Sequence, residues 1–186
     1  MTDLCKKGRE VHGLMIRKAI LEDIPAIAEI YDEIHTEEEA GHVSIGWVRE
    51  IYPTRETAEA ALNSGDLYVL EDGGKVVAAG RLNQRQEPSY AEAGWEYDAK
   101  EEEVMFLHTL VVSPKGENRG YGKAFVLFYE DFAIKRGCKY LRMDTNEKNR
   151  RARKFYSKMG YKEVGIVPCE FNGIRGVQLV CLEKKL

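Results

Sequence analysis

The sequence predicts a mixed α/β layer fold in a single domain. Along its 186 residues, short β-rich runs alternate with longer stretches in which apolar residues recur every three or four positions. These segments follow the order β-α-α-β-β-β-α-β-α-β-β, which is typical of a sheet covered by helices. The most apolar run, VMFLHTLVV at residues 104–112, predicts a central strand with both faces covered.

Composition narrows the class of protein. Hydrophobic residues make up 44% of the chain and charged residues 32%, as in globular domains. The formal net charge of -3 gives no global positive field, so we expect neither a nucleic-acid partner nor a membrane partner. The four cysteines show no CxxC spacing, so we expect no metal. The absence of an apolar run long enough for a signal peptide or a membrane span predicts a cytoplasmic protein.

The N-terminal half begins with a strand and two helical stretches. We interpret residues 1–13 as an N-terminal extension that need not be ordered, and residues 14–186 as the domain. Residues 14–19 predict the first strand, and apolar residues at helical spacing between Ile24 and Ile34 predict a helix after it. Residues 46–63 read as a second helical stretch, which is broken at Pro53 and restarts at Thr54.

A hairpin and a long excursion follow. Residues 66–71 and 75–82 are β-rich and flank Asp72-Gly73-Gly74, a turn that predicts an antiparallel hairpin. Residues 83–103 are polar, aromatic-bearing and aperiodic. Because loops of this length in compact domains are usually functional or mobile, we expect the substrate to bind near this excursion.

The C-terminal half alternates helices and strands. Apolar residues between 124 and 133 predict a helix that ends at Gly137, and residues 140–144 predict a strand. Residues 149–159 form an amphipathic pattern that predicts another helix. Two last strands are expected on either side of the Asn172-Gly173 turn, at about residues 162–167 and 176–182.

The loop after the central strand reads SPKGENRGYGKA, with three glycines and three cations. A P-loop requires G-x-x-x-x-G-K-[ST], but Gly116 and Gly122 are one residue too far apart, and Ala124 replaces the hydroxyl residue. A dinucleotide fingerprint starting at Gly120 would meet Phe125 where a small residue is needed. What remains is a loop with free N–H groups at a helix N-terminus, which suits a pyrophosphate held without a metal. A simple turn from strand to helix is the alternative interpretation of these glycines.

Two motifs occur together in this half of the chain. The first is Val112-Ser113-Pro114 followed by Glu117-Asn118-Arg119-Gly120-Tyr121-Gly122, and the second comprises Asn149, Ala152, Tyr156, Gly160 and Tyr161. They match V-x-P with [QR]-x-x-G-x-[GA], and N-x-x-A-x-x-x-Y-x-x-x-G-[FY], except that Glu117 stands where Gln or Arg is usual. The pattern resembles the GNAT (general-control-related N-acetyltransferase) superfamily, and the likeness covers nearly all of residues 14–186.

The resemblance implies a mostly antiparallel mixed sheet with helices on both faces and a splayed central strand pair. Acetyl-CoA would lie where those strands separate, against the backbone of Leu110, Val111 and Val112. The pyrophosphate would bind at the loop, on Glu117, Asn118, Arg119, Gly120, Tyr121, Gly122, Lys123 and Ala124. A carboxylate at Glu117 would repel it by roughly 1 kcal/mol. Asn149 would hydrogen-bond the cofactor or cap its own helix.

Acetyl transfer to an amine needs a neutral nucleophile, stabilisation of an oxyanion and a proton for the departing thiolate. Tyr156 matches the family position of the general acid. For the base, His108 in the central strand and Glu103 at the start of that strand are competing candidates. A buried histidine held by a backbone carbonyl is the second interpretation of His108.

The family likeness also implies where the acceptor binds. The segments that line this side carry Trp47, Tyr52, Tyr90 and Trp95, together with the acidic residues Glu92, Glu96 and Asp98. An aromatic and acidic wall favours a cationic amine. Ordinary packing of scattered aromatic residues is the alternative interpretation.

We therefore predict an acyltransferase that moves an acetyl group from acetyl-CoA to a primary amine of a small molecule, by direct attack in a ternary complex. A protein N-terminal or lysine acetyltransferase is the rival in the same chemical class, and it would need an open groove. Two rivals from different classes are a non-catalytic acyl-CoA-binding sensor and a protein-interaction domain that keeps only the fold. A homodimer formed through the last strands is common in such folds.

Overall fold

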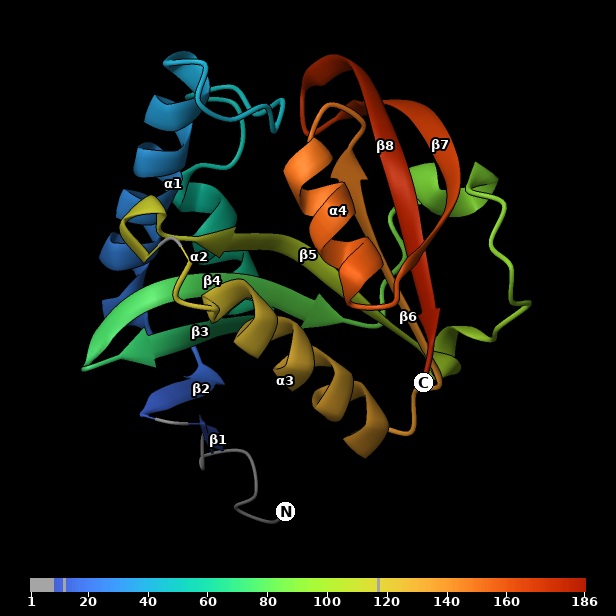
Figure 1. Cartoon of the computed structure of the whole chain (residues 1–186), viewed down its shortest axis with the longest axis horizontal. Helices are drawn as coiled ribbons and strands as arrows, with labels where there is room; N and C mark the ends of the chain where they lie inside the picture. The colour runs from blue at the N-terminus through green and yellow to red at the C-terminus, as the bar shows by residue number, and fades with distance from the viewer. Residues whose placement is uncertain (1–8, 12, 117) are drawn as a thin grey trace.

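An eight-stranded mixed sheet organises the residues that this computed structural model describes, 9–11, 13–116 and 118–186 (Figure 1). The strand order is β1-β2-β3-β4-β5-β6-β8-β7, and β5 with β6 is the parallel pair. The strands are β1 (Arg9–Val11), β2 (Leu14–Lys18), β3 (Leu67–Asp72), β4 (Lys75–Asn83), β5 (Val104–Val112), β6 (Tyr140–Asn146), β7 (Lys162–Phe171) and β8 (Ile174–Lys185). The predicted mixed, mostly antiparallel fold is confirmed.

Helices cover both faces of this sheet. Helices α1 (Ile24–Glu39) and α2 (Arg55–Asn63) pack on one face, and α3 (Tyr121–Lys135) and α4 (Arg150–Lys158) pack on the other, the near side in Figure 1. The apolar spacing explains α1, because Ile24 and Ile27 have no exposed surface and belong to the same core cluster as Val69. On the other face, the hydroxyl of Tyr129 donates to the carbonyl groups of Met105 at 2.6 Å and Arg142 at 3.1 Å, which ties α3 to both β5 and β6.

The long excursion between β4 and β5 packs against the C-terminal half of the sheet. It contains two 3-10 turns, η2 (Pro88–Glu92) and η3 (Glu101–Glu103), and its aromatic residues form a separate core cluster with β5, β7 and β8. Tyr90 is fully buried and stacks on Phe106, with 5.9 Å between the ring centroids. The excursion is therefore a fixed cover of this part of the sheet.

Strands β5 and β6 separate halfway along their length, as predicted. Their register covers only Val104–Leu107 against Tyr140–Met143, and beyond it Figure 1 shows β5 turning toward α1 and α2 while β6 passes beneath α4. A β-bulge lies at this point, because Thr109 has a φ of 50° and the register with β4 shifts between Ala79 and Arg81. The bulge re-aims the side chains that follow it and frees one edge of the β5 backbone.

One expectation about the N-terminal half needs correction. Residues 46–53 are not helical, because Gly46 and Glu50 adopt positive φ values of 80° and 65°, and only Thr54 starts the helix, α2. Within the predicted N-terminal extension, β1 is ordered and pairs with β2 through Arg9 and Ile16. The rest of that extension, residues 1–8 and 12, lies outside the described residues, whereas Gly13 takes up the turn between the strands.

Candidate active site

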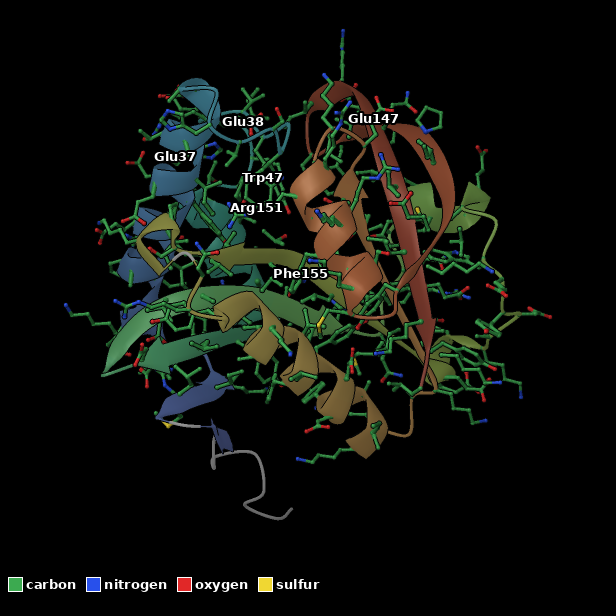
Figure 2. All side chains as sticks on the ribbon, in the orientation of Figure 1. Glu37, Glu38, Trp47, Glu147, Arg151 and Phe155 are labelled. Atoms are coloured by element: carbon green, nitrogen blue, oxygen red, sulfur yellow. The ribbon has the colours of Figure 1, made fainter. Side chains whose placement is uncertain are left out.

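A cavity of about 1330 Å³ opens where β5 and β6 separate. Its lining includes β5 from Leu107 onward, residues 144–146 of β6, the start of α3, one side of α4 and the loop between α1 and α2. Figure 2 labels Trp47 on the loop side and Arg151 and Phe155 on α4, facing each other across this space. Because pockets for a single drug-sized ligand measure about 300–1,000 Å³, the cavity has room for two substrates side by side.

One end of the cavity is the loop that leads into α3, which we call the donor end because the pyrophosphate of the acetyl donor is expected there. The first helical hydrogen bond runs from the Ala124 N–H to the Gly120 carbonyl at 2.9 Å, so the N–H groups of the three residues between them have no acceptor within the helix. Gly120 adopts a φ of 79°, and no heavy atom lies within 4 Å of the place that a Cβ would take. The backbone conformation, and not crowding, therefore favours glycine here, and the helix N-terminus faces open space that suits a phosphate.

Five of the predicted pyrophosphate residues line the cavity, namely Asn118, Gly120, Tyr121, Gly122 and Lys123. Tyr121 contributes only its backbone, because its ring lies beneath Gly116 and its hydroxyl donates to Asp72. Lys148 and Arg150 also line the cavity and add to its positive charge.

The remaining predicted loop residues stand differently. The Arg119 guanidinium is turned toward the Tyr121 hydroxyl at 3.4 Å and the Asp72 carboxylate at 3.9 Å, so it does not line the cavity. Ala124 begins the helical ladder and is likewise absent from the lining. Glu117, the departure from the family pattern, lies outside the described residues.

The splayed strand presents its backbone to the same cavity. Leu110, Val111 and Val112 all line it, and Val111 and Val112 pair on their other side with Ala79 and Ala78 of β4. The Val111 side chain is buried against α1 and α2. Because pairing with β6 has ended, the edge that faces β6 is free to hydrogen-bond an extended ligand arm.

Asn149 lies at the cavity edge and caps α4. Its side-chain oxygen accepts the Ala152 N–H at 3.0 Å, which is the N-cap geometry. Of the two roles expected for Asn149, the geometry therefore accounts for its placement through the cap, while contact with acetyl-CoA stays a prediction.

Tyr156 projects from α4 onto the cavity lining. Its ring packs on Phe155 and Tyr161, with centroids 5.1 and 5.9 Å away, and the residue is 8% exposed. Burial raises the pKa of Tyr156 well above its ordinary value, and the negative charge of Asp144 raises it further. The phenol therefore keeps its proton at neutral pH, as a general acid must.

His108 lies on β5 directly after Leu107, the last residue paired with β6. It lines the cavity together with Trp47 and Tyr52, whose part of the cavity we call the acceptor end. Its Nε2 is 3.3 Å from the side-chain oxygen of Asn83, and its Nδ1 is 3.9 Å from a Glu87 carboxylate oxygen. Burial, reinforced by the positive charge of Arg81, lowers the pKa of His108 to about 4. The imidazole is therefore neutral at pH 7 and only weakly basic. A backbone hydrogen bond to Arg85 acts against this lowering, so contacts from both an amide side chain and the backbone hold the ring.

The structure places Glu103, the competing candidate for the base, away from the cavity. Glu103 lies five residues before His108, about 16 Å at the usual strand rise, and does not line the cavity. Its carboxylate accepts the Lys139 Nζ at 2.6 Å, and this contact, more than any other, lowers the pKa of Glu103. It is an ion-paired surface residue at the opposite end of β5.

The four predicted acceptor residues divide into two pairs. Trp47 and Tyr52 line the cavity, and the Tyr52 ring lies between Trp47 and Phe171 with centroid distances of 5.9 and 5.4 Å. Tyr90 and Trp95 do not line it, because both are packed in the excursion, where the indole Nε1 of Trp95 donates to the Tyr90 carbonyl at 3.1 Å.

The acidic residues expected beside these aromatics also lie away from the lining, namely Glu92, Glu96 and Asp98. The excursion therefore supports the acceptor wall from behind, and Glu87 is its residue on the lining. The acidic character of the acceptor end comes from different carboxylates than those expected.

Asp144 is the site residue that the sequence patterns did not predict. It lies on β6 beside the split, lines the cavity, and accepts a hydrogen bond from the Tyr90 hydroxyl. Burial raises the pKa of Asp144 to about 6, against the lowering effect of the Tyr90 bond, and the Glu87 charge raises it further. The available signal was an acidic residue near the carboxyl end of a strand parallel to the central one.

The described residues contain no group of three or more His, Cys, Asp or Glu side chains that could hold a metal ion. A search of those same residues also finds no helix that is both long and apolar enough to cross a membrane.

Comparisons with known proteins agree with this geometry. The Acetyltransferase (GNAT) family profile matches residues 24–161, and the chain therefore belongs to the GNAT acetyltransferase family. It is an N-acetyltransferase that uses acetyl-CoA, the acetyl donor of this family. A sequence search of curated proteins finds no match.

Solved structures share the whole fold at low sequence identity. A GNAT-family acetyltransferase from Streptococcus agalactiae is 24% identical, with 95% of this chain and 98% of that chain covered and a TM-score of 0.78. A putative acetyltransferase from Salmonella typhimurium, yncA, solved with acetyl-CoA, is 17% identical over 93% and 94%, with a TM-score of 0.66. The ribosomal-protein-S18-alanine N-acetyltransferase from Escherichia coli is 16% identical over 92% and 93%, with a TM-score of 0.62. These likenesses concern the fold alone.

Proposed function

We propose that the protein transfers the acetyl group of acetyl-CoA to the primary amine of a small molecule, with both substrates bound at once. The observation that carries this proposal is the closure of the acceptor end by two distant segments. The α1–α2 loop reaches β6, where a Cβ on Gly46 would lie 2.3 Å from the Asn146 amide nitrogen. The same loop meets the β7–β8 turn, where a Cβ on Gly173 would lie 3.4 Å from Ile51.

This closure favours a small acceptor over a polypeptide. A protein N-terminus or lysine arrives on a chain that must lie along an open groove. Here the edge-on contacts of Tyr52 with Trp47 and Phe171 join the loop to the β7–β8 turn across that path. A small molecule fits the space that remains, whereas a peptide would have to displace these aromatic contacts.

The chemistry of the lining supports a cationic amine. Two carboxylates, Asp144 and Glu87, face the acceptor end together with the aromatic rings of Trp47 and Tyr52. Aromatic faces and carboxylates both attract an ammonium group. Arg81 is the cation on this part of the lining, and it lies 3.6 Å from the carboxylate of Asp66.

The donor end supports catalysis over sensing. When bound, acetyl-CoA supplies an activated thioester. The free N–H groups at the start of α3, the cation of Lys123 and the free edge of β5 fit its pyrophosphate and its extended arm. A sensor needs only these features, whereas this chain also holds the protonated phenol of Tyr156 at the split, where a thiolate would leave.

A direct test combines calorimetric titration with acetyl-CoA and a thiol-release assay over a panel of acceptors. The panel contains small primary amines with one or two positive charges, a peptide with a free N-terminus and a peptide with an internal lysine. We expect binding of acetyl-CoA and turnover of small amines only. Turnover of peptides without turnover of small amines would overturn the proposal, and binding without turnover of any acceptor would favour the sensor.

A further inference from the structure

We propose that Asp144 is the catalytic base that takes the proton of the acceptor ammonium, and that the Tyr90 hydroxyl positions its carboxylate. This inference rests on the proposed function and deepens it at the same site. It comes from a geometric juxtaposition: a carboxylate on the cavity lining, beside the split of β5 and β6, is anchored from behind by a fully buried phenol.

The position of Asp144 suits a base that works opposite Tyr156. Asp144 follows Met143, the last β6 residue in register with β5, so it is the first β6 residue beyond the end of strand pairing. Its charge raises the pKa of Tyr156 on one side of the cavity and that of Tyr52 on the other, so it lies within electrostatic reach of both phenols. A carboxylate between these hydroxyls adjoins the place where amine and thioester must meet.

The hydrogen bonding of Asp144 leaves one oxygen for the acceptor. The Tyr90 hydroxyl donates to Oδ2, and the Tyr90 ring is fixed by Phe106 and Trp95 at centroid distances of 5.9 and 5.7 Å. Among the described residues, none donates a hydrogen bond to Oδ1. A bound ammonium therefore meets a preorganised acceptor atom without displacing a protein contact.

Six titratable groups interact electrostatically with Asp144. Those that act on it or are acted on by it come from the excursion, the α1–α2 loop, α4, β7 and β8, and are Tyr90, Glu87, Tyr52, Tyr156, Cys169 and Cys181. None of these groups carries a positive charge. Arg81, the cation on the same part of the lining, is not among the groups that act on Asp144 and lies 3.6 Å from the Asp66 carboxylate, so an acceptor ammonium can take the place of a counter-ion.

Three other residues could act as the base, namely Glu103, His108 and Glu87, and each is less suitable than Asp144. Glu103 is distant from the cavity and paired with Lys139. His108 has a pKa of about 4, below the value of about 6 for Asp144, so it takes up a proton less readily near neutral pH. Glu87 lines the cavity, but its side chain is 37% exposed, and its carboxylate lies 3.9 Å from the His108 Nδ1.

The proposed proton transfers balance the reaction. The ammonium gives its first proton to Asp144, which later passes it to water through the cavity. The freed nitrogen lone pair attacks the thioester carbonyl carbon, a C–N bond forms, and the C–S bond breaks as the intermediate collapses. Tyr156 gives its proton to the leaving sulfur and regains one from the nitrogen, so the products are an amide, a thiol and one released proton.

The test begins with Asp144→Asn, which keeps size and the acceptor oxygen for Tyr90. We expect kcat/KM for the amine to fall about 10²–10⁴-fold at pH 7, the range for losing a general base, with acetyl-CoA affinity within about twofold of wild type. Asp98→Asn, an exposed residue off the cavity, is the matched control and should leave both unchanged.

Tyr90→Phe separates positioning from structure. Because the Tyr90 hydrogen bond lowers the pKa of Asp144, its removal should raise that pKa and move the acidic limb of kcat/KM to higher pH. Carbon-13 NMR of the Asp144 carboxyl in the ligand-free protein gives the same comparison without turnover. It should titrate near pH 6 in wild type and higher in the variant.

Three outcomes decide the matter. If wild type turns over small amines and Asp144→Asn keeps most of kcat/KM, this inference fails while the proposed function stands. If the Asp144 carboxyl titrates well below its expected value, or Tyr90→Phe moves neither its titration nor the acidic limb, the positioning role fails. If wild type binds acetyl-CoA but acetylates no amine in the panel, the proposed function itself fails, and Asp144 has no proton to take.

Discussion

Strand β6 carries two charged side chains two residues apart, and the structure treats them in opposite ways. Arg142 lies under the excursion, where its Nε donates to Glu183 at 2.9 Å and its NH2 group donates to the Tyr97 carbonyl at 2.8 Å. Its guanidinium also lies 4.4 Å from the ring centroid of Trp95. Asp144 lies on the same face of the strand and faces the cavity, and among the described residues the Tyr90 hydroxyl is its one hydrogen-bond donor.

The two residues differ in whether their hydrogen-bond partners belong to the protein: Arg142 is fully paired within the fold, whereas Asp144 is open to a ligand. The Glu183 carboxylate is almost wholly buried, and its second oxygen accepts the Glu96 N–H at 2.8 Å, so every partner of the Arg142 network belongs to the protein. Such a network fixes the excursion against the sheet. Asp144 keeps one oxygen, Oδ1, to which no donor in the described part of the chain hydrogen-bonds, and such an atom costs stability unless a ligand uses it.

The comparison predicts its largest effect on stability at Arg142. Arg142→Met should lower the free energy of unfolding by about 3–5 kcal/mol, because Glu183 would remain buried without its cation. Chemical denaturation measures the change. The double variant Arg142→Met with Glu183→Leu should recover part of the loss, and a single-variant loss below about 1 kcal/mol would show that the network is not structural.

Tyr156, in contrast to Arg142, is a polar group on the cavity lining. Among the described residues, none hydrogen-bonds its hydroxyl, so Tyr156→Phe should leave the free energy of unfolding nearly unchanged. It should lower kcat by about 10²–10³-fold, because the leaving thiolate loses its proton donor. The thiol-release assay and acetyl-CoA titration measure both effects, and Tyr97→Phe, whose ring packs on Tyr140 away from the cavity, is the control. An unchanged kcat would remove Tyr156 from the acid role.

The pH dependence of stability sharpens the comparison further. The folded pKa of Asp144, about 6, lies above its ordinary 3.8, so its stabilising contribution is complete below about pH 4 and is lost as pH rises through 6. The folded pKa of His108, about 4, lies below its ordinary 6.5, so its contribution is present above pH 6.5 and is lost as pH falls through 4. The two contributions oppose each other in wild type.

Single variants should separate the pH-dependent contributions of Asp144 and His108 to the free energy of unfolding. Relative to wild type, Asp144→Asn should gain roughly 3 kcal/mol in unfolding free energy between about pH 4 and 6.5, at about 1.36 kcal/mol per pKa unit. His108→Gln should lose a similar amount over the same interval. Denaturation curves across this pH interval suffice, and a flat difference for either variant would mean that its pKa is not shifted in the folded protein.

The smallest effect is expected at Asn149, whose side chain, like that of Arg142, hydrogen-bonds within the protein. Asn149→Ala should cost about 1 kcal/mol of stability through the lost N-cap of α4, with little change in KM for acetyl-CoA. Asn149→Asp keeps a capping oxygen and should restore stability. A large rise in KM with unchanged stability would instead place the amide on acetyl-CoA.

Local pattern predicted most of the fold and the donor end of the site. The run at 104–112, the glycines of the following loop and the Asn149 to Tyr161 motif each act over a few residues, so sequence spacing suffices to find them. The prediction of a helix over residues 46–53 was wrong. Glu50 adopts a left-handed conformation, and its residue type does not predict this.

The acceptor end depends on tertiary placement, which spacing does not contain. Tyr90 and Trp95 are aromatic residues of the expected excursion, but the cavity lies on the other side of the wall that they build. Asp144 reaches the cavity only because pairing of β5 and β6 stops at Met143. The number of residues paired between β5 and β6 and the position of the bulge in β5 decide which side chains reach the cavity. These two features are set when the sheet assembles, so local sequence spacing does not reveal them.

The closure of the acceptor end by the α1–α2 loop and the β7–β8 turn divides the protein into a constant half and an exchangeable half. Neither segment contributes to the start of α3 or to the free edge of β5, which form the donor end. If the proposed function holds, changes in the length or composition of these two segments should alter the range of acceptors and leave acetyl-CoA binding unchanged. A chimera that exchanges both together is the natural route to an altered acceptor.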